Sequence, residues 1–167
     1  MKANRPSVYV AALGLSCCLL GLFGGCVTQT AYTAVANRIP PPDPGYARVY
    51  LYSDNFMQQA RATSCGVSFD GKPEIDLGSF QVLYVDHPQG SLKIKACLRG
   101  VWPTGEEEIV LELAPGETRY VQLGTQGNGN HIGCHCHFVL LADPSQAMRD
   151  IVKCWYVGPS LPNPSKG

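Results

Sequence analysis

From Ala47 onward, apolar and polar residues alternate in one short segment after another, and this alternation restricts the fold more than any other feature. Side chains of a β-strand point to opposite faces in turn, so such a segment forms a strand with one buried face. In residues 91–99, the apolar side chains that share a face are Leu92, Ile94, Ala96 and Leu98. The opposite face carries Lys93, Lys95 and Cys97. The same period in residues 47–53 and 63–69 predicts two further strands.

Turn-forming residues separate these segments. Asp70-Gly71 is a typical two-residue hairpin turn. His87-Pro88-Gln89-Gly90 predicts a second hairpin and Ala114-Pro115-Gly116-Glu117 a third, because Pro and Gly occupy positions that β-turns favour. Near the C-terminus, Asp143 as N-cap and Pro144 at the first helical position predict one short helix. The strands are therefore expected to be joined mainly by tight turns.

These elements predict an all-β domain over residues 47–157. Seven to eight short strands with one short C-terminal helix form most simply a small antiparallel β-sandwich, in which two sheets bury their apolar faces against each other. The 18 Gly and 13 Pro of the 167-residue chain are scattered as turn residues and follow no long repeat. Residues 158–167 are expected to form a disordered tail.

The first 25 residues are typical of an export signal. A basic start precedes a mostly apolar stretch, and residues 6–37 contain no charge. The stretch ends in "LFGGC", which resembles the lipobox of bacterial lipoproteins. The resemblance implies removal of residues 1–25 and lipidation of Cys26. Two alternatives stay open: an uncleaved membrane anchor, because residues 8–27 are about long enough to span a bilayer, and a secreted protein without lipid.

Residues 26–46 follow as a lipidated cysteine and a Pro-rich tether. Its four prolines favour extended polyproline geometry, which would hold the domain away from the membrane. Val27 stands where an Asp in Gram-negative lipoproteins favours retention in the inner membrane. The resemblance therefore implies the outer membrane, with the domain facing the periplasm. That compartment is oxidising, so disulfides persist in it.

Several motifs of the domain carry a further resemblance. They are GYARVYLY at 45–52, VSFDGK at 67–72, LGSFQVLYVDHPQGSLKIKA at 77–96, LELAPGETRYVQLG at 111–124 and VLLADPSQAMRDIVK at 139–153. In these motifs the chain resembles a family of small bacterial lipoproteins known as domain of unknown function 2846. The family implies a lipid-anchored envelope β-domain. It has no established catalytic residues, so no catalytic role is transferred to this chain.

The segment NHIGCHCHF, residues 130–138, places three histidines and two cysteines in nine positions. In a strand, Cys134 and Cys136 would lie on the same face as the apolar side chains of Ile132, Phe138 and Leu140. This apolar face predicts that the two cysteines point into the core. The opposite face would carry His131, His135 and His137. A tetrahedral Cys2His2 zinc site within the segment would need ligands on both faces. Two histidines at i, i+2 on a strand, such as His135 and His137, can share one zinc or copper ion, and His131 or His87 could complete the set; an exposed polar face is the alternative.

Five cysteines follow Cys26, so at least one stays outside intramolecular pairs; they are Cys65, Cys97, Cys134, Cys136 and Cys154. The Cα atoms of Cys134 and Cys136 would lie about 6.6–7 Å apart with parallel side chains, which is at or beyond the limit for a disulfide. Cys65 faces the core by its own parity, which favours a bond to Cys134 or Cys136. Cys97 lies on the lysine face and is expected to meet Cys154. A bond between Cys65 and Cys97 is the rival connectivity.

Charge and motifs narrow the function only partly. The formal net charge is zero, so the chain has no basic field for nucleic acid. The sequence contains no nucleophile elbow, phosphate-binding loop or HExxH motif. The leading hypothesis is a non-enzymatic, lipid-anchored envelope module that contacts the membrane through its lipid and binds or supports an envelope protein. The alternative is a metal-binding or redox-linked envelope module that uses residues 131–137.

Overall fold

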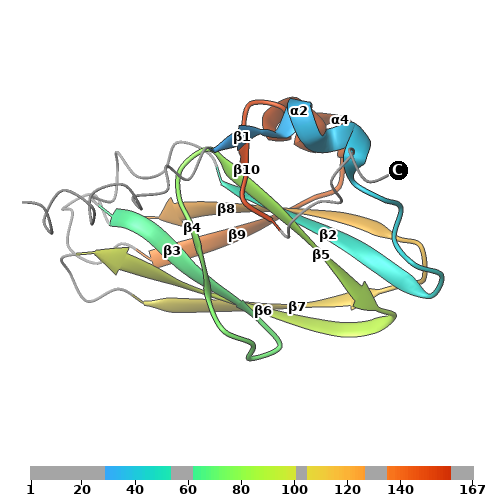
Figure 1. Ribbon diagram of the computed structural model, residues 1–167. Helices are drawn as coiled ribbons and strands as arrows, with labels where there is room; N and C mark the ends of the chain where they lie inside the picture. The colour runs from blue at the N-terminus through green and yellow to red at the C-terminus, as the bar shows by residue number, and fades with distance from the viewer. Residues whose placement is uncertain (1–28, 54–61, 101–104, 127–134, 159–167) are drawn as a thin grey trace, which may run out of the picture.

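The computed structural model describes residues 29–53, 62–100, 105–126 and 135–158, and the predicted all-β sandwich is confirmed (Figure 1). One sheet has the strand order β1-β10-β5-β2-β8-β9 and the other has the order β4-β3-β6-β7. The strands of the first sheet are β1 (Thr30–Ala31), β2 (Tyr46–Ser53), β5 (Gln81–Pro88), β8 (Thr118–Gln126), β9 (His135–Leu141) and β10 (Trp155–Tyr156). Those of the second are β3 (Ala62–Phe69), β4 (Ile75–Leu77), β6 (Gly90–Gly100) and β7 (Glu106–Leu113).

The six-stranded sheet is mixed, which differs from the expected antiparallel arrangement. β2 runs parallel to β8, and β10 runs parallel to β5, whereas the other neighbouring strands are antiparallel. The described residues also form ten strands where seven to eight were expected, because three of the strands are only two or three residues long. Such short strands give too few alternating residues to stand out in a sequence.

Two of the three predicted hairpins are instead arches that connect the sheets. β5 and β6 flank the Pro88-Gly90 turn but lie in different sheets, and so do β7 and β8 around Ala114–Glu117. Only the Asp70-Gly71 turn joins paired strands: both residues have positive φ, and Lys72 N–H donates to Phe69 O at 3.0 Å. Turn residues reverse the chain, but the same alternation suits strands that pair edge to edge and strands that face each other across a core.

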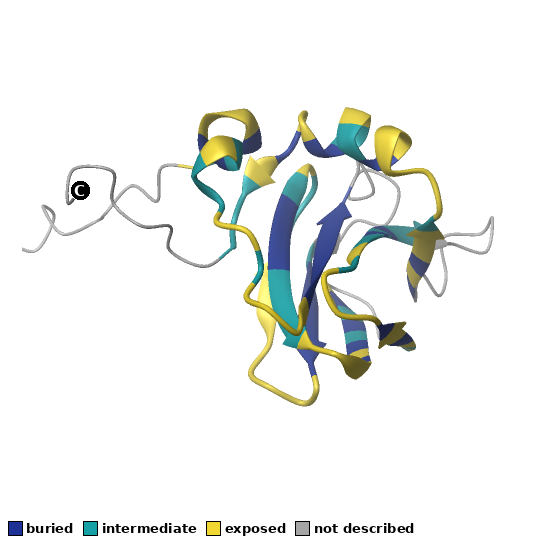
Figure 2. Ribbon diagram, turned by 90° about the vertical axis from the view of Figure 1, so that its right-hand side faces the viewer, coloured by how far each residue is buried: buried dark blue, intermediate teal, exposed yellow. Residues whose placement is uncertain are grey.

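The core between the sheets contains the residues that alternation placed inside. Leu92, Ile94, Ala96 and Leu98 are buried from one sheet, and Val49, Leu51, Val121 and Leu123 are buried from the other. In Figure 2 the dark-blue, buried stretches lie along the strands of the sandwich. Cys136 and Phe138 also point inward as predicted. Leu140 has the same parity but is 48 % exposed, so the inward face of β9 ends before the strand does.

A second core covers the outer face of the six-stranded sheet. It is formed by tyrosines of β2 and β5 together with α2 (Tyr32–Val35), the 3-10 turn η3 (Ala36–Arg38) and α4 (Pro144–Ile151). Figure 1 shows both helices on this side of the sheet. α4 begins as predicted, with the Asp143 carboxylate accepting from Ser145 N–H at 2.9 Å.

The expected tether is wrong over Thr30–Arg38, which is part of the folded domain. Tyr32 is 4 % and Val35 2 % exposed, and Tyr32 N–H donates to Cys154 O at 2.9 Å. The physical reason is that the outward tyrosines of β2 and β5 form an apolar surface, and these N-terminal side chains cover it. Among the described residues, no helix is long and apolar enough to cross a membrane.

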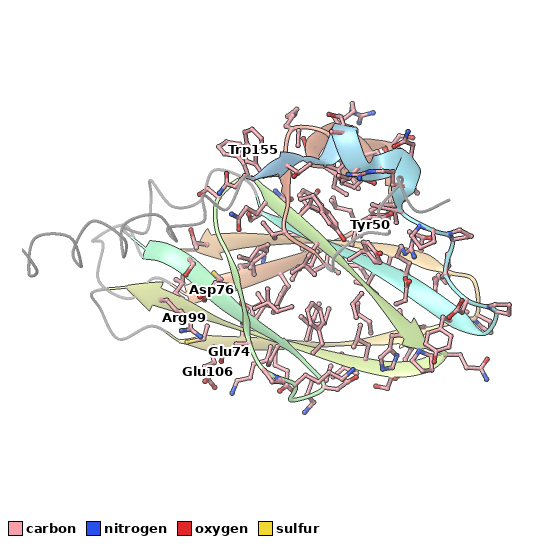
Figure 3. All side chains as sticks on the ribbon, viewed as in Figure 1. Tyr50, Glu74, Asp76, Arg99, Glu106 and Trp155 are labelled. Carbon is pink, nitrogen blue, oxygen red and sulfur yellow. The ribbon has the colours of Figure 1, made fainter. Side chains whose placement is uncertain are left out.

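The outer face of the four-stranded sheet is polar. Ion pairs cross it between neighbouring strands: Lys93 Nζ lies 3.0 Å from Glu108 Oε1, and Lys95 Nζ lies 2.5 Å from Glu106 Oε2. Arg99 reaches from β6 to Glu74 and to Asp76 of β4, as Figure 3 shows. These side chains are exposed, so the pairs keep the face soluble and contribute little to stability.

Candidate functional site

The sandwich brings two of the predicted cysteines together in its core. Cys65 lies on β3 and Cys136 on β9, so they belong to different sheets and are 71 positions apart in the chain. Their Sγ atoms are 3.0 Å apart, and both residues are 0 % exposed. Each side chain points inward because of its parity in the strand, as the sequence predicts. The two thiols are thus placed for a bond that would join the sheets.

The surroundings of Cys136 disfavour its ionised form. The contact with the Cys65 thiol and burial in the apolar core both raise the pKa of Cys136 far above that of an ordinary thiol. The thiolate is the form that attacks disulfides and binds metals. A buried thiol whose pKa is raised in this way rarely ionises, so Cys136 is chemically inert once the domain is folded, which fits a structural role better than a redox cycle.

The two other predicted pairings are wrong. Cys97 points away from the core on the outer face of β6, because it pairs with Gly66 while its neighbour Leu98 pairs with Cys65. Cys154 is buried in the second core, where its Sγ lies 3.5 Å from Asp150 O and 3.7 Å from Ser53 O. The sandwich separates Cys97 from Cys154, and opposite parity separates Cys97 from Cys65. Cys26 and Cys134 lie outside the described residues.

The histidine face is placed only in part. His137 is exposed on β9, opposite in parity to Cys136, and its Nδ1 lies 3.5 Å from Glu107 Oε1. His135 begins β9 but its side chain is not described, and His131 lies outside the described residues. Within the described part of the chain, no three His, Cys, Asp or Glu residues form a group that could hold a metal ion.

His87 is held at the end of β5, away from His137. Its Nδ1 is 2.7 Å from Pro88 O and its Nε2 is 2.9 Å from Asp70 Oδ2. Both ring nitrogens thus face hydrogen-bond acceptors. Asp70 also accepts from Lys93 N–H, and this bond, followed by the contact with His87, lowers the pKa of Asp70. The arrangement fixes the β3–β4 turn against the β5–β6 arch and does not bring His87 to His137.

Arg48 forms a buried polar centre that the sequence did not reveal. Its guanidinium donates to both oxygens of Asp86 at 2.6 Å and to Pro40 O at 2.6 Å. It also lies 4.3 Å from the centre of the Tyr84 ring. Burial acts to lower the pKa of Arg48, but the hydrogen bonds and charge of Asp86 outweigh it and keep that pKa above its usual value. Alternation put Arg48 on the tyrosine face, yet only the strand register pairs it with Asp86.

A small cavity of about 110 Å³ lies beside α4 and β10. Its lining residues are Tyr52, Ser53, Phe80, Asp150, Lys153 and Cys154. Phe80 has a φ of +52°, a backbone conformation that bulky residues rarely adopt, and its side chain is 40 % exposed. Trp155 N–H donates to Phe80 O at 2.7 Å, so the backbone of a second exposed aromatic residue is bound to that of Phe80.

Comparison of the chain with protein-family models and with curated proteins found no match.

Proposed function

We propose that this protein is a lipid-anchored component of the cell envelope with a non-enzymatic binding or structural role. Its place would be the outer membrane, with the sandwich facing the periplasm, as the resemblance to the lipoprotein family of unknown function implies. The observation that carries the proposal is the buried pair Cys65–Cys136, whose Sγ atoms lie 3.0 Å apart. An intersheet disulfide suits a protein that folds in an oxidising compartment, which is where the sequence of residues 1–26 directs it.

The bond forms by ordinary thiol–disulfide exchange. Cys65 and Cys136 together lose two protons and two electrons as the Sγ–Sγ bond forms. A disulfide oxidant, such as an envelope dithiol oxidase, accepts both and is reduced to two thiols. The step takes place during folding, because Cys65 and Cys136 are both buried in the finished core, which excludes the oxidant, and the pKa of Cys136 is raised there. The product is a cross-link and not a catalytic centre.

Mass spectrometry of the protein isolated from membranes tests the proposal. Cys26 should be the first residue and should carry acyl chains. A peptide that joins Cys65 to Cys136 should be lighter by two hydrogen atoms than the reduced pair, whereas Cys97 should react with an alkylating reagent. The Cys97→Ser variant is the matched control, since it should keep the same cross-link. An unmodified Cys26, or free thiols at both Cys65 and Cys136 after export, would contradict the proposal.

A metal-binding envelope module is the second candidate, and one observation favours it. His137 and Glu107 come from different sheets, and their side chains meet at 3.5 Å on the accessible edge of the sandwich. Imidazole and carboxylate are ligands of zinc, and imidazole is also a ligand of copper. Purified protein should then retain zinc or copper in near-stoichiometric amount, and joint replacement His135→Ala and His137→Ala should remove it. Metal-free protein of unchanged stability would refute this function.

A further inference from the structure

The anchor would attach at a defined place on the fold. This inference rests on the proposed lipidation of Cys26. β1 begins at Thr30, so only four residue steps separate the lipid from the folded domain, a reach of at most about 14 Å. β1 pairs with β10, with Ala31 opposite Trp155. The lipid chains must therefore enter the bilayer close to Trp155, and the domain cannot stand far from the membrane.

Exposed apolar side chains gather near this attachment point. Phe80, Val152 and Trp155 are 40 %, 44 % and 42 % exposed. Their backbones are neighbours: Trp155 N–H donates to Phe80 O at 2.7 Å, and Val152, the C-cap of α4, lies three residues before Trp155. Figure 3 shows Trp155 projecting outward beside β1. Such side chains would cost free energy if they faced water permanently.

We propose that Phe80, Val152 and Trp155 form a membrane-docking face, which rests on the bilayer that holds the anchor. Trp side chains favour the interface between headgroups and acyl chains, because the indole ring is apolar and its N–H is polar. Phe80 has an unfavourable backbone conformation, with a φ of +52°, at a position where its aromatic ring is exposed.

Tethering to the lipid makes this small contact sufficient for persistent binding to the bilayer. Three side chains alone would bind a bilayer only weakly, as even one long acyl chain gives marginal binding. A short link to the lipid keeps the face at high local concentration over the membrane, so weak insertion becomes persistent. Lys153 pairs with Asp150 at 2.9 Å, so the face is expected to bind through apolar insertion and to depend little on anionic lipid.

The test uses Trp155 fluorescence in the full lipidated chain. Trp102, outside the described residues, is replaced by Phe so that Trp155 is the only reporter. The protein is placed in phosphatidylethanolamine–phosphatidylglycerol vesicles that carry bromine on the upper part of the acyl chains. Trp155 emission should shift to the blue and be quenched. Insertion of about twelve Gly and Ser residues between Gln29 and Thr30 should reduce the quenching roughly twofold or more.

Variants separate the docking face from the anchor. Phe80→Ser with Val152→Ser should reduce quenching of Trp155 while the mass still shows lipid on Cys26. Ile75→Ser is the matched control: Ile75 is 41 % exposed on β4 of the other sheet, and its loss should change nothing. A lipidated protein whose Trp155 stays unquenched would refute docking and leave the anchor intact. A chain without lipid on Cys26 would refute both the anchor and the docking face.

Discussion

Reduction of the proposed Cys65–Cys136 cross-link should destabilise the domain strongly. The two residues are 71 positions apart, so their bond closes a long loop in the unfolded chain. In the chain-entropy model, a loop of this length changes the free energy of unfolding by about 4 kcal/mol at 25 °C. The folded state should gain little strain from the bond, because the two side chains already meet in the core. The perturbation is therefore a change in oxidation state with no change in sequence.

Thermal unfolding of one protein sample, oxidised or fully reduced, measures this effect. A loss of about 4 kcal/mol corresponds to a fall in Tm of roughly 10–15 °C for a domain of this size. Reduction should be carried out in denaturant, followed by refolding with reductant, because the folded core shields the sulfurs. The Cys65→Ala and Cys136→Ala double variant should melt at the same temperature with and without reductant. Cys97→Ser should keep the full difference.

Two outcomes would refute the reasoning. The first is an equal melting temperature for oxidised and reduced protein when the oxidised sample contains the cross-linked peptide. It would show that closing the loop in the unfolded chain does not raise the free energy of unfolding. Refolding in the presence of a disulfide oxidant that left Cys65 and Cys136 as thiols would show that the two side chains do not meet as described. The second outcome would also remove the observation on which the proposed envelope function depends.

The remaining predictions concern charged side chains. Asp86→Asn removes the partner charge of buried Arg48 and should lower the free energy of unfolding by about 2–3 kcal/mol in urea titrations, whereas the exposed-pair control Glu106→Gln should change it by less than about 0.5 kcal/mol. Equal effects would contradict the buried ion pair. Asp70→Asn should destabilise the domain at pH 6 but not below pH 3, because the lowered pKa of Asp70 gives stability that is present above about pH 4 and lost as pH falls. A pH-independent difference in Tm would contradict the lowered pKa of Asp70, which the Lys93 N–H bond and then the His87 contact produce.

Local patterns in the sequence predicted the structural features that depend only on neighbouring residues in the chain. Alternation identified the inward faces, since Val67 and Ile94 are buried where their parity placed them. The N-cap Asp143 and the Asp70-Gly71 turn were also predicted, because each is specified by two or three consecutive residues. The inward direction of Cys136 was predicted for the same reason.

Contacts between segments that are distant in the chain could not be predicted from local sequence patterns. The Pro88-Gly90 turn looks like a hairpin, but whether the following strand pairs with its predecessor depends on competition among all the edges available. The parallel pairing of β2 with β8 joins segments more than 60 residues apart and leaves no local signal. The pairing of Arg48 with Asp86 follows from the antiparallel register of β2 with β5, so the sequence alone does not predict this ion pair.

The pattern of apolar residues in the N-terminal segment is too weak to predict that residues 30–38 belong to the folded domain. Residues 30–38 contain only two side chains that become fully buried, Tyr32 and Val35. No amphipathic period can be recognised in so short a stretch. The segment is ordered by the surface that it covers, which is made of tyrosines on strands far along the chain. The distance between the proposed lipid on Cys26 and the domain, and hence the proposed docking face, depends on this contact.

The edge strands give a last prediction. β9 and β7 are edges of the two sheets, and edge strands with open N–H groups invite pairing with other chains. Glu107 occupies an inward position at the start of β7, and its carboxylate accepts from Phe138 N–H of β9 at 3.3 Å. Sequence alternation marks Glu107 only as a charge in an apolar row. In the structure the Glu107 carboxylate accepts the Phe138 N–H, which another strand could otherwise use for pairing.

Glu107→Val should therefore promote self-association. The change frees the Phe138 N–H, costs about 1 kcal/mol for the lost hydrogen bond and leaves an apolar edge that favours strand pairing. Size-exclusion chromatography with light scattering should show dimers or larger species that increase with concentration. Glu112→Val is the matched control, because Glu112 lies on the same strand but faces outward. If both variants stay monomeric at every concentration, Glu107 is not protecting the edge; if both associate, surface apolarity alone is responsible.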